Sequence, residues 1–333
     1  MRIAINGFGR IGRSVFRILN ARDDLEVVAI NDITSKESLE YLLKYDTVMG
    51  RFPDEVHLQD DMLITSKHSV KMISETDPSA LPWKVLDVNI VIESTGRFRT
   101  RKDLQMHLNA GADFVILTVP AKDEIDYTVV IGVNDADLRK EHKIISNASC
   151  TTNCLAPMAK ILNDAFGIEF GVINTIHAYT NDQRLADVPH SDWRRGRTAA
   201  ENIIPTTTGA ARAVGQVLPE LNGKLDGIAT RVPVPDGSVV DLVARIKKNV
   251  TIEDINEVVR TASDSKALSL VLEYSTLPVV SSDIIGNPHS SIYDAPFTRV
   301  IEGNLIKTLN WYDNEWGYSN RVVDLIDRLD DLN

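Results

Sequence analysis

The chain has 333 residues, of which 43% are hydrophobic and 25% charged, and its net charge is −11. This length allows roughly two domains, each with its own core. The acidic balance repels phosphate backbones and argues against nucleic acid as a partner. No apolar run approaches the roughly 18 residues of a membrane-spanning helix. Only two cysteines are present, which fits a reducing cytoplasm without a disulfide framework.

Strands and helices are predicted to alternate in the first part of the chain. Short apolar runs predict strands over 2–6, 25–32, 88–95, 114–120, 127–134 and 143–149. Apolar residues at helical spacing predict helices over 13–22 and 101–112. Such alternation implies parallel pairing, so we expect an α/β, Rossmann-type dinucleotide-binding domain. Residues 47–78 have the pattern of a hairpin insertion instead.

After about residue 150 the strands are separated by longer connections. Strands are predicted over 170–180, 226–235 and 238–248, and helices over 151–166, 251–265 and 320–332. We expect a second, α+β domain on a mixed, largely antiparallel sheet. The predicted division is 1–149 plus a C-terminal helix, 315–333, for the first domain and 150–314 for the second. The active site is expected where two such domains meet.

The segment "INGFGRIG" has the spacing of a dinucleotide-binding turn, with glycines at Gly7, Gly9 and Gly12. The first permits a tight turn, the second admits a pyrophosphate, and the third lets helix and strand approach closely. Asp32 ends the second predicted strand about 20 residues later, where a carboxylate accepts hydrogen bonds from ribose hydroxyls. It would repel a 2′-phosphate, so NAD is favoured over NADP. The alternative is a Gly-rich turn with a surface aspartate.

The cysteines lie four residues apart, as Cys150 and Cys154 in "SNASCTTNCLAP". Cys150 lies where a strand ends and a helix begins, a position that lowers the pKa of a thiol. Cys154, one turn later, is predicted to be buried and inert. A metal site would need two more soft ligands, so none is predicted. His177 is the candidate base for the thiol, although a lone histidine at a strand end is more often structural.

The other histidines are predicted to be ordinary surface or loop residues. They are His57, His68, His107, His142, His190 and His289.

Five segments together resemble one enzyme family. They are "INGFGRIGR", "SNASCTTNCLAP", "HAYTNDQ", "AAENIIPTTTGAA" and "WYDNEWGYSNR", in order from residue 2 to about 328. The chain is similar to the phosphorylating glyceraldehyde-3-phosphate dehydrogenases. Without this resemblance, "IIPTTTGAA" is typical of a polar loop that leads into a helix, "RRGR" of a solvated basic turn, and "WYDNEWGY" of core packing.

The resemblance implies covalent catalysis in which Cys150 attacks the aldehyde carbon of D-glyceraldehyde 3-phosphate as a thiolate. His177 would raise the nucleophilicity of the thiol and remove the hydroxyl proton during hydride transfer to NAD. Inorganic phosphate would then attack the thioester and release the acyl phosphate 1,3-bisphosphoglycerate. A homotetramer is also implied, with the 178–201 loop crossing to a neighbour's cofactor site.

The resemblance also implies three groups of binding residues. The substrate phosphate would bind Thr180 and Arg231. Inorganic phosphate and the reacting end would bind Ser149, Thr151, Arg195, Thr208 and Gly209. NAD would bind the three glycines together with Arg10, Ile11, Asp32, Thr118 and Asn314.

Two positions depart from the family pattern. Thr76 stands where many members carry Arg or Lys near the adenine, and Asp236-Gly237-Ser238 stands where others often show "PNVS". Erythrose-4-phosphate dehydrogenase, which has the same thiol–histidine pair, is the close alternative function. A non-catalytic NAD-binding regulatory protein is an alternative of another class.

Overall fold

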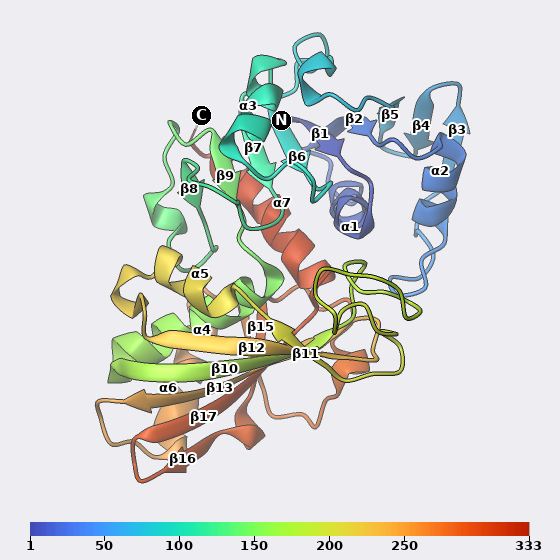
Figure 1. The fold of residues 1–333 in the computed structure, drawn as a ribbon. Coiled ribbons are helices and arrows are strands. Elements are labelled where there is room, and N and C mark those ends of the chain that lie inside the picture. The colour runs from blue at the N-terminus through green and yellow to red at the C-terminus, as the bar shows by residue number, and fades with distance from the viewer. Residues whose placement is uncertain (333) are drawn as a thin grey trace. The chain divides into compact units, whose positions relative to one another are not determined.

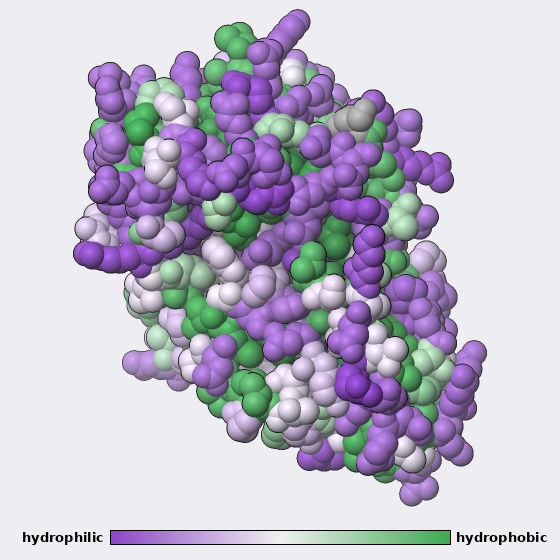
Figure 2. All heavy atoms as spheres, turned by 180° about the vertical axis from the view of Figure 1, so that it is seen from behind, coloured by the Kyte–Doolittle hydropathy of each residue, from purple (hydrophilic) through white to green (hydrophobic). Residues whose placement is uncertain are grey.

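The computed structural model describes residues 1–332, and the chain forms two compact units. The first comprises 1–129, 135–149 and the segment that starts at Ser319, and the second comprises 130–134 and Cys150–Tyr318. Hydrophilic residues predominate on the face shown in Figure 2, with hydrophobic ones scattered among them. Within residues 1–332, no helix combines the length and the apolar character needed to span a membrane.

The first unit is built on a sheet with the order β3-β4-β5-β2-β1-β6-β7-β9-β8, drawn from blue to green in Figure 1. Its strands are β1 (Arg2–Asn6), β2 (Glu26–Asn31), β3 (Val56–Gln59), β4 (Met62–Thr65), β5 (Ser69–Ile73), β6 (Ile90–Glu93), β7 (Phe114–Leu117), β8 (Tyr127–Thr128) and β9 (Ile144–Ser146). Its helices are α1 (Arg10–Leu19), α2 (Lys36–Lys44), α3 (Arg101–Asn109) and most of α7 (Trp316–Asp330).

The central strands of this sheet pair in parallel, which confirms the α/β fold class. β1 pairs with both β2 and β6, and β7 continues the parallel set. These strands are buried on both faces, as expected for a sheet in which helices cover parallel strands. The predicted hairpin is also confirmed, because β3 and β4 are antiparallel.

The predicted strand over 127–134 is mostly wrong. Only Tyr127–Thr128 pairs with β9. The backbone N–H groups of Val133 and Asn134 then donate to the carbonyl oxygen of Val130, and Gly132 has a φ of +80°. A local turn therefore satisfies backbone groups that the apolar pattern had assigned to a strand.

The second unit has a mixed sheet in the order β11-β12-β10-β13-β17-β15-β14, with β16 beside β17. Its strands are β10 (Ile168–Ala178), β11 (Ile204–Thr207), β12 (Leu225–Val232), β13 (Ser238–Ile246), β14 (Leu272–Ser275), β15 (Ser291–Asp294), β16 (Arg299–Ile301) and β17 (Leu305–Tyr312). β10–β12 and β14–β15 are parallel, and the other pairs are antiparallel. The predicted sheet type is therefore confirmed.

The helices α4 (Cys150–Phe166), α5 (Ala210–Val217) and α6 (Ile252–Ser263) accompany this sheet, and α4 contacts β10, β13 and β17. β10 alternates between buried and exposed residues. Its buried positions include Thr175 and His177, whereas Phe170 and Val172 are exposed. Because side chains on a strand alternate between faces, β10 presents His177 on the opposite face to Phe170 and Val172.

The turn into β13 explains the departure at Asp236-Gly237-Ser238. Gly237 has a φ of +83°, and a Cβ there would lie 2.2 Å from the carbonyl oxygen of Ser281, so this turn requires glycine. Asp236 is 1% exposed, and its Oδ1 accepts a hydrogen bond from the Gly237 N–H at 2.8 Å. No residue from 1 to 332 donates to its Oδ2.

A second buried carboxyl group explains how Asp236 is tolerated. Asp313 is 1% exposed and accepts hydrogen bonds from the N–H groups of Gly286, Glu315 and Trp316. Burial and the neighbouring charge of Asp313 raise the pKa of Asp236 to about 9. The two carboxyl groups therefore hold a proton at neutral pH, because two adjacent buried carboxylates would repel each other.

Asp236→Asn should flatten the pH dependence of stability. Unfolding releases the shared proton between the ordinary aspartate pKa of about 4 and the raised folded pKa. The free energy of unfolding of the parent protein should therefore fall as pH rises from about 4 to about 9. Scanning calorimetry across this range should give the variant a shallower fall in Tm. Asp264→Asn, at an exposed position, should keep the parent slope, and equal slopes for all three proteins would contradict the shared proton.

Candidate active site

The glycine turn between β1 and α1 leaves room for a pyrophosphate. Gly7 has a φ of +94°, and a Cβ there would lie 2.6 Å from the backbone nitrogen of Thr95. A Cβ on Gly12 would lie 2.2 Å from the carbonyl oxygen of Gly7, whereas the space beside Gly9 is open. No side chain caps the first turn of α1, which begins at Arg10. Such an N-terminus favours an anion.

Asp32 follows β2 and is tied to the glycine turn. One of its carboxylate oxygens accepts a hydrogen bond from the N–H of Phe8 at 2.7 Å, and the other from the N–H of Thr34 at 2.9 Å. Each oxygen has two lone pairs, so both can also accept from ribose hydroxyls. The fit of this unit to NAD therefore rests on the turn and on this fixed carboxylate.

The other predicted cofactor residues of the first unit lie near the same strand ends. Arg10 forms an ion pair with the buried carboxylate of Asp46, and Ile11 follows it in the first turn of α1. Thr118 comes directly after β7, and its hydroxyl donates to the carbonyl oxygen of Glu93 at 3.1 Å. Thr76 is exposed after β5.

A buried polar network behind the turn was missed from the sequence. Glu93 is fully buried and accepts hydrogen bonds from the Asn6 side chain and from the N–H of Thr95. The Trp83 indole N–H donates to Nδ1 of His107 at 3.1 Å, so Nε2 of this histidine donates to Glu93. His107 is 0% exposed, so its prediction as a surface residue is wrong. His68, 6% exposed, is a second such error.

In the second unit, Cys150 and His177 form a direct contact. Cys150 is the first residue of α4 and is half-buried. His177 lies near the end of β10 and is 5% exposed. The distance from the Cys150 Sγ to the His177 Nε2 is 3.5 Å. A nucleophile and a base within such reach are the recognisable parts of covalent catalysis.

The sequence predicted a lowered pKa for the Cys150 thiol. This prediction is wrong when the thiol ionises without transferring its proton to His177. Burial raises this pKa to about 11, although the charge of Arg231 and hydrogen bonds from Thr151 oppose the shift. Burial and the charge of Arg231 lower the pKa of His177 to about 3. A thiolate alone and an imidazolium alone are therefore both disfavoured at this site. Proton transfer from sulfur to Nε2 creates two opposite charges that stabilise each other at short range.

Arg231 is the third member of this cluster. It lies on β12, directly beside His177 in the parallel register of β10 and β12. Its Nη1 is 2.7 Å from the His177 Nδ1 and donates to the carbonyl oxygen of Ala178 at 2.8 Å. Its Nε is buried and has no hydrogen-bond partner within residues 1–332. A cation with an unused buried donor is suited to an anionic ligand.

Tyr312 was predicted to be a packing residue, but its hydroxyl joins α4 to β10. The hydroxyl is 2.8 Å from the Thr151 Oγ1 on α4 and 2.9 Å from the Thr175 Oγ1 on β10. Its ring meets the ring of His177 edge to face, with centroids 5.9 Å apart. Tyr312 therefore holds the helix that begins at Cys150 against the strand that carries His177. No signal in the sequence distinguishes it from neighbouring aromatic residues.

Arg195 belongs to an ordered loop rather than to a solvated turn. Its Nη1 pairs with the carboxylate of Asp182. Its Nε donates to the hydroxyl of Thr206 at 2.9 Å, and its Nη2 donates to the carbonyl oxygen of Thr207 at 3.2 Å. The charge of Arg195 also contributes to the lowered pKa of His177.

The remaining predicted phosphate residues lie at the ends of elements. Thr208 and Gly209 connect β11 to α5, and Gly209 is the N-cap of that helix with no side-chain cap. The hydroxyl of Thr208 accepts from the N–H of Ala210 at 3.2 Å. Thr180 follows β10 after Tyr179, and Ser149 immediately precedes α4. The segment predicted as a polar loop therefore includes the strand β11.

Asn314 and Cys154 complete the predicted residues of the second unit. The carbonyl oxygen of the Asn314 side chain accepts a hydrogen bond from the Ser238 hydroxyl at 2.6 Å. The amino group is the other polar group of this side chain. Cys154 is 0% exposed, as predicted, and burial raises its pKa. Its sulfur contacts Ser291 and Asn310 rather than a catalytic partner.

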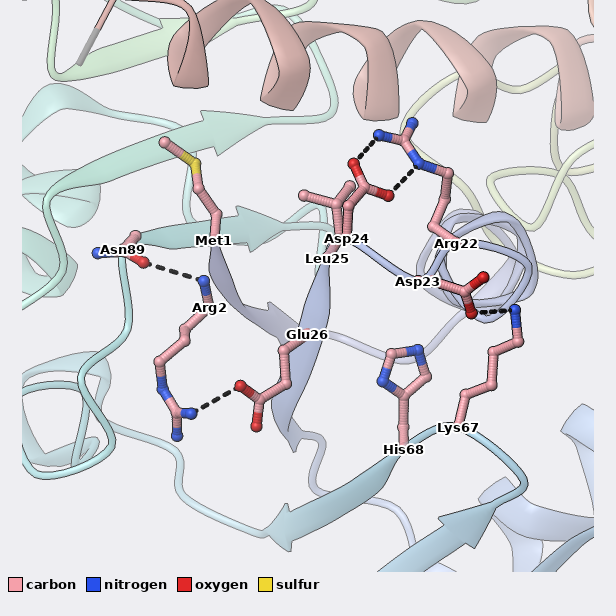
Figure 3. Close-up of a pocket in the computed structure, with 10 residues that line it drawn as sticks. All are labelled: Met1, Arg2, Arg22, Asp23, Asp24, Leu25, Glu26, Lys67, His68 and Asn89. Atoms are coloured by element: carbon pink, nitrogen blue, oxygen red, sulfur yellow. Dashed lines mark hydrogen bonds and ion pairs between the residues drawn. The ribbon is translucent and has the colours of Figure 1, made fainter.

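A pocket in the first unit lies near the start of β1 and β2 and contains none of the predicted site residues. In Figure 3 its charged side chains point toward one another, and they form the pairs Arg2–Glu26, Arg22–Asp24 and Lys67–Asp23. Because these charges already neutralise each other, the pocket offers no obvious ligand.

A dinucleotide-binding fold together with a thiol–imidazole pair and a nearby arginine is typical of an NAD-dependent dehydrogenase. Comparisons with known proteins agree with this class. Residues 1–101 match the family described as glyceraldehyde 3-phosphate dehydrogenase, NAD binding domain, and residues 149–314 match its C-terminal domain. The chain belongs to the glyceraldehyde-3-phosphate dehydrogenase family, and its cofactor is NAD.

Similar curated proteins match along almost the whole chain. The glyceraldehyde-3-phosphate dehydrogenase of Borreliella burgdorferi is 55% identical, with 99% of each chain covered. Those of Priestia megaterium and Mycolicibacterium smegmatis are 54% and 52% identical, with 98% of this chain and 97% of the relative covered.

His177→Asn should make the Cys150 thiolate harder to form. Without an imidazole to take the proton, the pH midpoint of Cys150 alkylation by iodoacetamide should move to higher pH, and kcat should fall by about 10²–10⁴-fold. Alkylation rates across pH, measured in a Cys154→Ala background, test this. His142→Asn, in the first unit, should leave both quantities unchanged. An unchanged midpoint in His177→Asn would show that the 3.5 Å contact does not control the thiol.

Tyr312→Phe should weaken activity as well as stability. The variant keeps the ring but removes the hydroxyl that joins α4 to β10. We expect a loss of about 1–3 kcal/mol in the free energy of unfolding and a fall of about 10-fold in kcat/KM. Tyr293→Phe is the matched control, because this buried hydroxyl bonds Asn256 and Thr298 instead. Equal kcat/KM in the two variants would contradict the role of Tyr312.

Proposed function

We propose that the protein oxidises D-glyceraldehyde 3-phosphate with NAD and inorganic phosphate to 1,3-bisphosphoglycerate. The observation that carries this proposal is the 3.5 Å contact between Cys150 and His177, with Arg231 beside it. The names of the similar proteins support the same substrate. When bound, NAD accepts a hydride from the substrate.

Cys150 supplies the covalent chemistry. As its sulfur bonds to the aldehyde carbon, the thiol proton passes to Nε2 of His177, which then gives it to the aldehyde oxygen to form a hydroxyl. This gives a thiohemiacetal. During oxidation of that carbon, His177 removes the hydroxyl proton and a thioester remains on Cys150. Phosphate then attacks the thioester carbonyl, and the sulfur leaves as a thiolate that recovers a proton.

Two anions must be held during this sequence. We propose that Arg231 and Thr180 bind the substrate phosphate, because the buried Nε of Arg231 has a donor to spare. Inorganic phosphate would be bound by the other predicted residues, which are Ser149, Thr151, Arg195, Thr208 and Gly209. Hydroxyls, backbone N–H groups and a guanidinium are suitable donors to phosphate oxygens.

Several residues are proposed to hold NAD. The glycine turn and the first turn of α1, with Arg10 and Ile11, would bind the pyrophosphate. Asp32 would bind the ribose. Thr118 and Asn314 are proposed for the nicotinamide end, with Asn314 oriented by Ser238.

The reaction is tested by its dependence on each substrate. Purified protein should form NADH from D-glyceraldehyde 3-phosphate in the presence of phosphate, and Cys150→Ser should abolish turnover. Cys154→Ala is the matched control and should remain active, because Cys154 has no catalytic contact. A clear preference for erythrose 4-phosphate would assign the alternative substrate. Failure to reduce NAD with either sugar phosphate would indicate a non-catalytic NAD-binding protein.

We also propose that the protein is a cytoplasmic homotetramer. Phe170 and Val172 on β10 and Ile228 on β12 are 50–59% exposed, which places apolar side chains together on an open sheet face. In the 178–201 loop, Leu185 and Trp193 are more than 80% exposed. Exposed apolar patches of this kind are typical of protein interfaces, and a second copy of this chain is the proposed occupant.

Charge on the open face of β10 should disrupt this assembly. The double change of Phe170→Asp and Val172→Asp would place carboxylates at an apolar contact, at a cost of several kcal/mol. Light scattering after gel filtration should show a smaller mass than that of the parent tetramer. Val85→Asp, at an exposed apolar position of the first unit, is the control. A parent protein that is monomeric, or a double variant that stays tetrameric, would contradict the proposed interface.

A further inference from the structure

The buried carboxyl group of Glu93 accepts four hydrogen bonds inside the first unit. Glu93 is the last residue of β6 and is 0% exposed. Its Oε2 accepts from the side-chain amino group of Asn6 at 2.5 Å and from Nε2 of His107 at 3.1 Å. Its Oε1 accepts from the N–H of Thr95 at 2.9 Å and from the Thr95 hydroxyl. An ionised carboxyl group only accepts hydrogen bonds, at about four lone-pair sites, so these contacts occupy all of them.

The direction of the hydrogen bonds that lead to Oε2 is fixed by the backbone at the end of β5. The side-chain oxygen of Asn31 accepts from the N–H of Glu75 at 2.8 Å, and its amino group donates to the side-chain oxygen of Asn6 at 2.7 Å. Neither amide can be reversed without placing two donors or two acceptors together. Asn6 therefore presents its amino group to position 93, and this position must supply an acceptor.

Glu93 contacts both sides of the glycine turn through these neighbours. Asn6 is the residue that precedes Gly7. On the other side, a Cβ on Gly7 would lie 2.6 Å from the backbone nitrogen of Thr95, so the segment after β6 lies directly against the turn. The Ser94 hydroxyl donates to the carbonyl oxygen of Gly7 at 2.6 Å. The path of the chain through Ser94 and Thr95 is therefore one wall of the turn, and Oε1 is the acceptor that holds it.

We propose that Glu93 is a positioning residue for NAD. Its Oε1 holds Thr95 against Gly7, and its Oε2 holds Asn6, so the N–H groups at the start of α1 keep the arrangement that binds a pyrophosphate. The carboxyl group is fully buried and acts on NAD only through these neighbours. A turn that is formed in advance loses little conformational freedom when the anion binds. This inference rests on the proposed function, in which the glycine turn and the first turn of α1 bind the pyrophosphate of NAD.

Glu93→Gln changes the hydrogen bonds at this position and keeps the volume of the side chain. Because Asn6 and His107 both donate to one oxygen, the glutamine should keep its oxygen there and turn its amino group toward Thr95. The Thr95 hydroxyl can rotate to accept, but the N–H of Thr95 then faces a donor and loses its partner. Isothermal titration calorimetry of the full-length protein at pH 7 should show a Kd for NAD that is higher by about 10–100-fold, the range for one bond to a charged group.

A matched control separates this effect from a loss of stability. Thr65 is 8% exposed and lies beside the start of β5, at the opposite edge of the sheet from the glycine turn. Its hydroxyl donates to the side-chain oxygen of Asn20 at 2.7 Å. Thr65→Val should lower the Tm and leave the Kd for NAD unchanged. In steady-state kinetics, Glu93→Gln should raise the KM for NAD by a larger factor than it lowers kcat.

A variant at an exposed position keeps the test open if Glu93→Gln does not fold. Thr95 is exposed, and Thr95→Val replaces the hydroxyl that donates to Oε1 by a methyl group. Its Kd for NAD should rise by about 2–10-fold, because the N–H of residue 95 still donates to Glu93. If Glu93→Gln does fold, the two effects should not add in the double variant, because both changes remove the same contact.

Two results would overturn this inference. One is a folded Glu93→Gln protein whose Kd for NAD is no higher than that of Thr65→Val. The other, where Glu93→Gln does not fold, is a Thr95→Val protein that binds NAD as tightly as the parent. Calorimetry does not depend on turnover. An active dehydrogenase in which Glu93→Gln binds NAD like the parent refutes only the role of Glu93. NAD affinity that depends on Glu93, in a protein that oxidises neither sugar phosphate, refutes only the proposed reaction.

Discussion

The contact between Cys150 and His177 is the constraint on which the proposed chemistry of this protein depends. Burial raises the pKa of the thiol and lowers the pKa of the imidazole, so neither group favours a charge of its own. At 3.5 Å the proton can move from the thiol to the imidazole. The resulting thiolate and imidazolium attract each other strongly, because the surrounding medium has a low polarity. In the proposed mechanism the thiolate therefore forms through the pair, not through the helix terminus alone.

The second unit is built so that this pair stays together. β10 carries His177 in register with Arg231 on β12, and α4, which begins at Cys150, packs against β10 and β17. The Tyr312 hydroxyl contacts both elements through Thr151 and Thr175. Three elements distant in the sequence thus determine one distance between sulfur and nitrogen. A chain with a net charge of −11 still supplies local cations where phosphates are expected, because charge acts locally at short range.

Much of this arrangement could be predicted from the residues, since its signals are local. The spacing of Gly7, Gly9 and Gly12 indicated the turn, and the change from strand to helix before Cys150 indicated the thiol site. Other features depend on neighbours that are remote in the chain. The strand predicted to 134 ends at Thr128 because a turn forms. His107 is buried because Trp83 and Glu93 satisfy both its nitrogens. The helix-terminus rule for Cys150 failed because desolvation is the larger effect.

The proposed covalent role of Cys150 is tested most directly by mass spectrometry of its peptides. The protein is incubated with D-glyceraldehyde 3-phosphate and NAD in the absence of phosphate, and then digested. Our account predicts an acyl group on the peptide that contains Cys150, and its release on addition of inorganic phosphate. NADH formation with no acyl group on this peptide, or with the group on another residue, would contradict the account.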